Sequence, residues 1–256
     1  MDIKLYVIPG SHPCATVEAA LALKGLEYER VDLLPGMSSV IQLARFGRRT
    51  VPGLVVDGYK VSGSRLILRT LEGLAPEPRL YPRDPEQVAA VDEAERWGDA
   101  DLQHATRLII GYALAKNPSA ADTYLVGANI PTLPAPVSAA ATRAVFTLEL
   151  RVLGGGPSGA EEAMRGLPEL LDKADGLIAG GVLGGDSPNA ADLQIAGSLR
   201  LLLTFADLRE QIDARPAGRL ARRLIPRYPG DMPAGTLPRD WIPRLEQTPE
   251  PLAAPA

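Results

Sequence analysis

Residues that build disulfides, metal centres and membrane spans are scarce in this chain of 256 residues. The single cysteine excludes an internal disulfide framework and a cysteine-rich zinc site. The two histidines lie far apart in the sequence and argue against a histidine-based site, so we expect no metal. No run of about 18 apolar residues occurs, which predicts that no segment spans a membrane.

An excess of positive charge is also lacking. The net charge is −4, so no positive field favours nucleic acid, and we expect neither a nucleic-acid nor a membrane partner. Asp2 and Lys4 interrupt the first residues and no apolar stretch follows, which is unlike a signal peptide and predicts a cytoplasmic protein. Arginine outnumbers lysine by 22 to 5, which we interpret as the base-composition bias of a bacterial genome rather than as phosphate recognition.

The first pattern that is present is an alternation of strands and helices over residues 1–74. Apolar runs and turn residues predict strands at residues 4–8, 28–33, 54–56 and 59–61. Helical spacing of apolar residues predicts helices over 11–25 and 62–71. This order predicts an α/β domain with a thioredoxin-like βαβαββα fold and a mixed four-stranded sheet.

Pro52 is the unusual residue of this domain, because it opens a strand. Proline cannot donate a ladder hydrogen bond, so it belongs at the first residue of a strand or at an edge. X-Pro bonds are the one place where a cis peptide is energetically accessible, and we predict a cis Val51–Pro52 bond. Such a bond would turn the Val51 amide and carbonyl outward. Opposite a helix N-terminus, these groups would form a slot for a small thiol peptide.

A proline-rich linker over residues 75–84 separates this domain from a region of helices only. We predict an all-α domain over 85–225 and an extended tail over 226–256, of which residues 249–256 are disordered. The helices of the all-α domain are expected at residues 85–115, 137–153, 161–178, 189–205 and 216–224. Asn189 and Asp192 at the start of one helix are interpreted as a capping box rather than as a catalytic pair.

Two further groups of residues have competing interpretations. An arginine-rich stretch lacks interleaved aromatic residues, which favours a solvated helix face over a nucleic-acid surface; it consists of Arg215, Arg219, Arg222, Arg223 and Arg227. Several aromatic residues could line an apolar pocket for an electrophile between the domains, although core positions are the favoured interpretation for most; they are Tyr81, Trp97, Tyr112, Tyr124 and Phe146.

Four motifs in order resemble the glutathione S-transferase superfamily, up to about residue 205. Ser11 with an aliphatic residue, Val17, six positions later is similar to the start of the family's first helix. The segment 50–54 resembles its cis-proline motif, 61–67 its glutamate–serine–x–alanine–isoleucine signature, and 189–193 its buried capping box. The resemblance implies a serine-type bacterial member that uses glutathione or another low-molecular-weight thiol as cosubstrate. It also implies a homodimer in which each N-terminal domain meets the partner's helical domain.

Ser11 is the first candidate for a catalytic residue. At a helix N-cap its hydroxyl would face the slot beside Pro52. A thiol bound there would experience the positive end of the helix, and a hydroxyl donor would stabilise the thiolate. The resemblance implies the same role for Ser11. The alternative is that Ser11 only caps its helix.

His12 and Cys14 lie beside this serine and are candidates for thiol binding. His12 could contact the thiol, or it could be a solvated loop residue. The run Ser11-His12-Pro13-Cys14 resembles the Cys–x–Pro–Cys of thioredoxins with its first cysteine replaced, so dithiol exchange is not available. The alternative for Cys14 is a small buried apolar side chain.

Ser64 is the second candidate, because a serine that opens a helix offers its hydroxyl and backbone N–H to an anion. In the resembling family this position binds the γ-glutamyl carboxylate of glutathione, and the preceding acidic residue binds the γ-glutamyl amine. Gly63 replaces that acid here, which leaves the identity of the thiol open. Arg49, like Arg48 before it, could hold a glycyl carboxylate or lie in a solvated loop.

These residues predict a thiol-dependent, glutathione-type transferase that conjugates a thiol to a small hydrophobic electrophile. Ser11 would activate the thiol, and Val51 and Ser64 would hold it. A second hypothesis is a non-catalytic binding or scaffold protein on the same fold, which the absence of an acid at Gly63 favours. A third is a zeta-type, thiol-assisted cis–trans isomerase of an unsaturated diacid. That reaction needs basic residues at the cleft, and Arg107 is one candidate.

Overall fold

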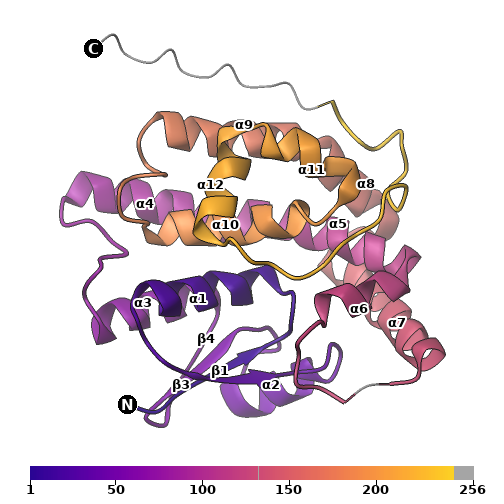
Figure 1. Ribbon diagram of the computed structural model, residues 1–256, viewed down its shortest axis with the longest axis horizontal. Coiled ribbons are helices and arrows are strands. Elements are labelled where there is room, and N and C mark those ends of the chain that lie inside the picture. The colour runs from indigo at the N-terminus through magenta and orange to yellow at the C-terminus, as the bar shows by residue number, and fades with distance from the viewer. Residues whose placement is uncertain (132, 245–256) are drawn as a thin grey trace.

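The computed structural model describes residues 1–131 and 133–244, and its first part is a four-stranded sheet with three helices (Figure 1). The strands lie in the order β2-β1-β3-β4; β1 is parallel to β2 and antiparallel to β3, and β3 is antiparallel to β4. The strands are β1 (Ile3–Val7), β2 (Glu29–Asp32), β3 (Gly53–Val56) and β4 (Tyr59–Ser62). The helices are α1 (His12–Leu23), α2 (Ser38–Phe46) and α3 (Ser64–Leu74). The predicted thioredoxin-like βαβαββα domain with a mixed sheet is confirmed.

Helices α1 and α3 lie between the sheet and the second part of the molecule, whereas α2 lies on the far side of the sheet (Figure 1). The helix face of α1 buries Val17 and Leu21 completely, in one cluster with Leu5 of β1 and Leu54 of β3. Complete burial of one such side chain stabilises the fold by about 1.5–3 kcal/mol. This packing fixes the start of α1 relative to the sheet.

The second part is helical, and none of its described helices is long and apolar enough to cross a bilayer. Its first helices are α4 (Pro85–Trp97), α5 (Gln103–Lys116), the short α6 (Ala121–Tyr124) and α7 (Ala135–Leu153). The remaining ones are α8 (Gly156–Arg165), α9 (Leu167–Ala179), α10 (Ala190–Leu202), α11 (Ala206–Asp213) and α12 (Pro216–Leu224). A π-helical turn, Gly98–Leu102, joins α4 to α5, and a 3-10 turn, Pro118–Ala120, precedes α6. The predicted all-α character of this part is confirmed.

Two helix boundaries differ from the predictions. The single helix expected over 161–178 is divided at Gly166 into α8 and α9. Pro168 in the first turn of α9 has no N–H, so it cannot continue the hydrogen-bond ladder of a preceding helix. The helix expected over 189–205 ends at Leu202, and α11 begins after Phe205 as a helix that the sequence did not indicate.

Helix α10 lies at the centre of the molecule, and all of its residues are buried. Its start is the predicted capping box: the Asp192 N–H donates to Asn189 Oδ1 at 3.0 Å, and the Asn189 N–H donates to Asp192 Oδ2 at 2.9 Å. Asp192 also accepts the Gly184 N–H at 2.8 Å. A cap of this kind is worth about 1–2 kcal/mol, so the structural interpretation of these two residues is confirmed.

Arg215 is a correction to the predicted solvated arginine face. Its side chain is only 1% exposed and forms ion pairs with Asp172 and Asp175 of α9, the second with 2.8 Å between Arg215 Nε and Asp175 Oδ2. Asp175 also accepts the Ala217 N–H at 2.8 Å, at the start of α12. The other four arginines of the stretch are exposed, as predicted. The pairing partners are 40 or more residues away in sequence, so no local pattern indicates them.

The chain after α12 runs as an extended segment along the helical part and past α10, α5 and α6 (Figure 1). Its Met232 forms an isolated parallel bridge with Phe205, with hydrogen bonds of 2.9–3.0 Å to the backbone of Ala206 and Thr204. Farther on, the Trp241 ring packs against Tyr112 of α5. The disorder predicted for residues 249–256 lies outside the described residues, and the exact domain boundaries stay predictions.

Candidate active site

The register of the sheet brings three chain segments to one edge. Tyr6 of β1 pairs with Gly53 of β3, and Gly53 pairs with Ser62 of β4. The carboxyl ends of β1 and β4 and the amino end of β3 therefore meet there. Since α1 follows β1 and α3 follows β4, the N-terminal ends of both helices face this edge (Figure 1). The edge is the candidate active site.

The segment before β3 has the predicted cis Val51–Pro52 bond. The Pro52 carbonyl accepts the Gly63 N–H at 3.0 Å and the Ser62 hydroxyl at 3.3 Å, which ties this segment to the start of α3. Val51 itself is half-buried, and within the described residues its N–H and C=O make no backbone hydrogen bond. Unpaired backbone groups of this kind are available to the backbone of a peptide ligand.

Ser11 occupies the N-cap position of α1 with extended backbone angles, φ −77° and ψ 123°. Its carbonyl accepts the N–H groups of Cys14 and Ala15 at 3.1 and 3.0 Å. Its side chain, however, makes no capping hydrogen bond to the described helix. The half-buried hydroxyl therefore lies at the positive end of a helix without being used as a cap.

The start of α3 provides a second helix N-terminus at this edge. Gly63 is its N-cap with φ +93°, a conformation that L side chains rarely adopt. Ser64 is the first helical residue and is buried, and among the described residues its hydroxyl has no hydrogen-bond partner. An anion here would receive backbone N–H groups that have no acceptor within the helix.

Cys14 lies in the core rather than at the edge. Its side chain is buried in the cluster around α1, as the alternative interpretation expected. Burial raises the pKa of its thiol to about 12, and the nearby Ser11 hydroxyl and Ile8 backbone oppose this only in part. At neutral pH the thiol is therefore protonated and a weak nucleophile.

His12 is also buried, and the solvated loop position considered for it is wrong. Its Nδ1 is hydrogen bonded to Ser198 Oγ of α10 at 3.1 Å, while its Nε2 has no partner among the described residues. Burial, and secondarily the charge of Arg107, lower its pKa to about 3. His12 is therefore a neutral contact between the start of α1 and the helical part. The sequence offered no signal for this, because Ser198 is 186 residues away.

The three arginines considered for binding a carboxylate lie in different environments. Arg48 and Arg49 are exposed in the turn between α2 and β3, and no ion pair engages them within residues 1–131 and 133–244. Arg107 of α5 is half-buried and pairs with Glu149 of α7 at 2.6 Å. Its charge is therefore already compensated.

The aromatic residues considered for an acceptor pocket are mostly core. Trp97, Tyr112 and Tyr124 are buried, and Tyr81 and Phe146 are half-buried against the same cluster. The Tyr81 hydroxyl donates to Glu95 Oε1 at 3.0 Å. These residues support the interface between α3 and α4 and the interior of the helical part.

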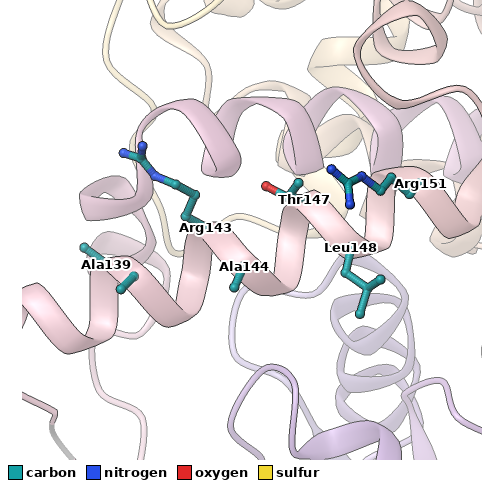
Figure 2. A pocket seen from close by; sticks show the side chains of 7 residues that line it. Ala139, Arg143, Ala144, Thr147, Leu148 and Arg151 are labelled. Carbon is teal, nitrogen blue, oxygen red and sulfur yellow. The ribbon is translucent and has the colours of Figure 1, made fainter.

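A hollow of about 600 Å³ lies along the outer side of α7. Its lining comes from α7 alone and includes Arg143, Thr147, Leu148 and Arg151; the two arginines point to one side of the helix and Leu148 to the other (Figure 2). The hollow does not include Ser11 and is therefore not the predicted cleft between the domains.

Comparisons with known proteins match the first part of the chain. Residues 5–79 match the family model described as the glutathione S-transferase N-terminal domain. The maleylacetoacetate isomerase of Rattus norvegicus is 38% identical over 80 residues, and the one of Mus musculus 36%. Each match covers 29% of this chain and 37% of the relative, so the chain aligns with little more than a third of these curated proteins.

Solved structures resemble nearly the whole chain in fold. A glutathione S-transferase from Rhodospirillum rubrum superposes with a TM-score of 0.56 and 21% identity, over 93% of this chain and 97% of that one. The β-etherase LigF from Sphingobium sp. does so with a TM-score of 0.51 and 23% identity, over 87% and 99%. Residues 5–79 therefore match the N-terminal domain of the glutathione S-transferase family, and the two-part fold of the chain resembles that of solved glutathione S-transferases.

Proposed function

We propose that this protein is a thiol-dependent transferase that conjugates glutathione, or a related small thiol, to a small hydrophobic electrophile. The observation that supports it most is the convergence, at one edge of the sheet, of two helix N-termini and an unpaired Val51 backbone. The bacterial and cytoplasmic setting indicated by composition stays a prediction.

The proposed reaction uses Ser11 to lower the pKa of the bound thiol. The positive end of α1 favours an anion, and a hydrogen bond donated by the Ser11 hydroxyl strengthens the preference for thiolate. The bound thiol releases its proton to solvent. The thiolate sulfur then attacks the electrophilic carbon, a carbon–sulfur bond forms, and the leaving group departs with its electron pair. The Ser11 hydroxyl makes no capping bond to α1, and its contact with the Cys14 thiol is the weak hydrogen bond of a sulfur partner.

The peptide part of the thiol is held by Val51 and Ser64 in this proposal. Val51 pairs with the peptide backbone, and the Ser64 hydroxyl and N–H bind a carboxylate at the start of α3. Gly63 offers no charge to a γ-glutamyl amine, so we expect weaker binding of glutathione than an acid there would give, by about 1–3 kcal/mol. Arg49, exposed beside this segment, is available to a second carboxylate.

Thermal shift measurements with glutathione and other small thiols test the binding step. At least one thiol should raise the melting temperature of the parent chain, and Ser64→Ala should abolish the shift. Thr70→Ala, an exposed position later on α3, serves as control and should keep the shift. If no thiol shifts the parent, a non-catalytic scaffold becomes the better hypothesis.

Turnover is tested with a chloronitroarene and the thiol that binds. Ser11→Ala should lower kcat about 10- to 100-fold, because it removes a hydrogen bond to a charged group. A rate equal to that of the parent would remove Ser11 from the mechanism. Thr70→Ala, the control of the binding test, should retain the parent rate.

A second candidate function is thiol-assisted cis–trans isomerisation, which the two maleylacetoacetate isomerase relatives favour. An unsaturated diacid would need cations at the site. Arg107 is compensated by Glu149, which leaves Arg48 and Arg49 as exposed cations near the edge. Incubating the protein with a cis-unsaturated diacid and a thiol, and following the double bond by NMR, separates isomerisation from conjugation.

We also propose a homodimer, supported by the outer face of α7. Val137, Leu148 and Val152 on this helix are 52–78% exposed, beside the hollow of Figure 2. An apolar stripe of this kind is typical of an interaction surface. Light scattering should give the mass of two chains for the parent and of one for Leu148→Asp. Val40→Asp, at an exposed apolar position on α2, should remain dimeric.

A further inference from the structure

The loop that carries Ser11 is held by a residue from the other end of the chain. The Tyr228 hydroxyl donates a hydrogen bond of 2.7 Å to the carbonyl oxygen of Gly10, across 218 residues of sequence. We propose that Tyr228 is a positioning residue for Ser11, and that the segment 225–232 is a strap that fixes the serine loop. This inference rests on the proposed function of Ser11.

The Gly10 carbonyl and the Ser11 N–H belong to the same planar peptide unit. The carbonyl end is bound by Tyr228, and the N–H end donates to the Ile8 carbonyl at 3.0 Å. A peptide plane held at both ends cannot rotate, so the Cα of Ser11 has a fixed place and only the rotation of its side chain remains free.

The same peptide is confined sterically. Gly10 has φ +73°, and a Cβ atom there would lie 2.8 Å from Cβ of Tyr124. Real Cβ atoms essentially never approach so closely, so the loop fits against the Tyr124 side chain only with glycine at position 10. Tyr124 in turn is fixed by a hydrogen bond of 2.7 Å between its hydroxyl and Thr204 Oγ1.

The strap is itself anchored on both sides of Tyr228. Before it, the buried Arg200 of α10 donates from Nε to the Ile225 carbonyl at 2.7 Å, and its guanidinium lies 5.8 Å from the centre of the Tyr228 ring. After it, the Asp231 N–H donates to Thr123 Oγ1 at 2.9 Å, followed by the Met232 bridge. The Tyr228 hydroxyl therefore reaches Gly10 from a rigid support.

Ser11 is also held from its other side. His12, the next residue, is bonded to Ser198 of α10. The helical part and the strap thus contact both sequence neighbours of Ser11 while its own hydroxyl makes no capping bond. A group that must act on a bound ligand gains from such support, because an uncontrolled shift of its backbone would misplace the hydroxyl.

The variant Tyr228→Phe removes one hydroxyl and keeps the ring. Amide hydrogen exchange of the peptide covering residues 8–14 should become about tenfold faster, since one hydrogen bond that closes the loop is lost. In the turnover assay kcat should fall about five- to tenfold, with KM for the thiol nearly unchanged. A merely structural role would not split kcat from KM in this way.

Tyr59→Phe is the matched control, because it also removes one tyrosine hydroxyl, at an exposed position at the start of β4 and away from the strap. It should leave both the exchange of residues 8–14 and kcat at the parent values. Unchanged exchange in Tyr228→Phe overturns the inference whether or not the protein turns over. Faster exchange with an unchanged kcat in an active protein overturns the positioning role. If the parent shows no turnover with any thiol, the proposed function fails, while the exchange still decides whether Tyr228 holds the loop.

Discussion

Helices α10 and α7 belong to the same helical part but have opposite environments. All residues of α10 are buried, and the helix contacts α1 of the first domain as well as α4 and α12. On α7, which is half as long again, Leu150 alone is buried among the described residues. The comparison shows that α10 is a buried element of the fold, whereas the exposed outer face of α7 is the surface at which we propose a partner.

The largest expected difference comes from the same substitution in both helices. Leu199→Ala on α10 removes a side chain that is 1% exposed and should lower the free energy of unfolding by about 2–5 kcal/mol. Leu148→Ala on α7 should change it by no more than about 0.5 kcal/mol, because that side chain is 61% exposed. Urea denaturation at a concentration where the chain is monomeric measures both. Equal losses would contradict this comparison.

Gly197 tests how closely α10 approaches α1. An added Cβ would lie 2.5 Å from Thr16 Oγ1 and 2.7 Å from the His12 carbonyl oxygen. Gly197→Ala should therefore destabilise the fold by about 1–3 kcal/mol, although alanine is the better helix former. Gly176→Ala on α9 is the control: outside the helix's own backbone, no atom of the described residues lies within 4 Å of the added Cβ, so it should stabilise by about 0.5–1 kcal/mol. A stabilising Gly197→Ala would show that the contact between α1 and α10 can relax.

The His12–Ser198 contact gives the α1–α10 interface a pH dependence. The pKa of His12 is lowered from 6.5 to about 3, so between these values the unfolded chain binds a proton that the folded chain does not. The contribution of His12 to the free energy of unfolding is therefore fully present above its unfolded pKa of 6.5, and it decreases as the pH falls below that value. Between about pH 8 and about pH 5.5 the loss should be about 1.4 kcal/mol, and His12→Gln should remove that component. If the free energy of unfolding depends on pH in the same way in the parent and in His12→Gln, folding does not lower the pKa of His12.

The smallest effect is expected at the ion pair that ties α7 to α5. Arg107 and Glu149 are both about 30% exposed, so solvent screens their attraction. Glu149→Gln should lower the free energy of unfolding by about 0.2–1 kcal/mol, measured by urea denaturation at low salt and again at high salt, where the difference should shrink. A loss larger than that of Leu199→Ala would mean that α7 is integral to the fold.

The features that the sequence predicted correctly depend on local patterns. The order of strands and helices, the cis bond at Pro52 and the capping box of Asn189 and Asp192 depend on residues a few positions apart. The helix ends at Gly166 and Leu202 were missed because competing turn signals and continued apolar spacing are hard to separate over one turn.

The features that the sequence did not predict depend on contacts between distant segments, and such contacts leave no periodic signal in the sequence. The burial of His12 against Ser198, of Arg215 against Asp175, and the bond from Tyr228 to Gly10 join residues 40 to 218 positions apart. Each of these polar residues looks like a surface residue from its neighbours in sequence. Their partners become visible only when the helical part is packed against the first domain.

The ultraviolet absorbance of bound thiolate, followed against pH in the complex with glutathione, tests the central claim most directly. If the edge of the sheet activates a thiol through Ser11, the bound thiol of the parent should ionise at a lower pH than the free thiol. In Ser11→Ala its titration should return toward that of the free thiol. A bound thiol that titrates like the free one in the parent, or identically in parent and Ser11→Ala, would contradict the claim.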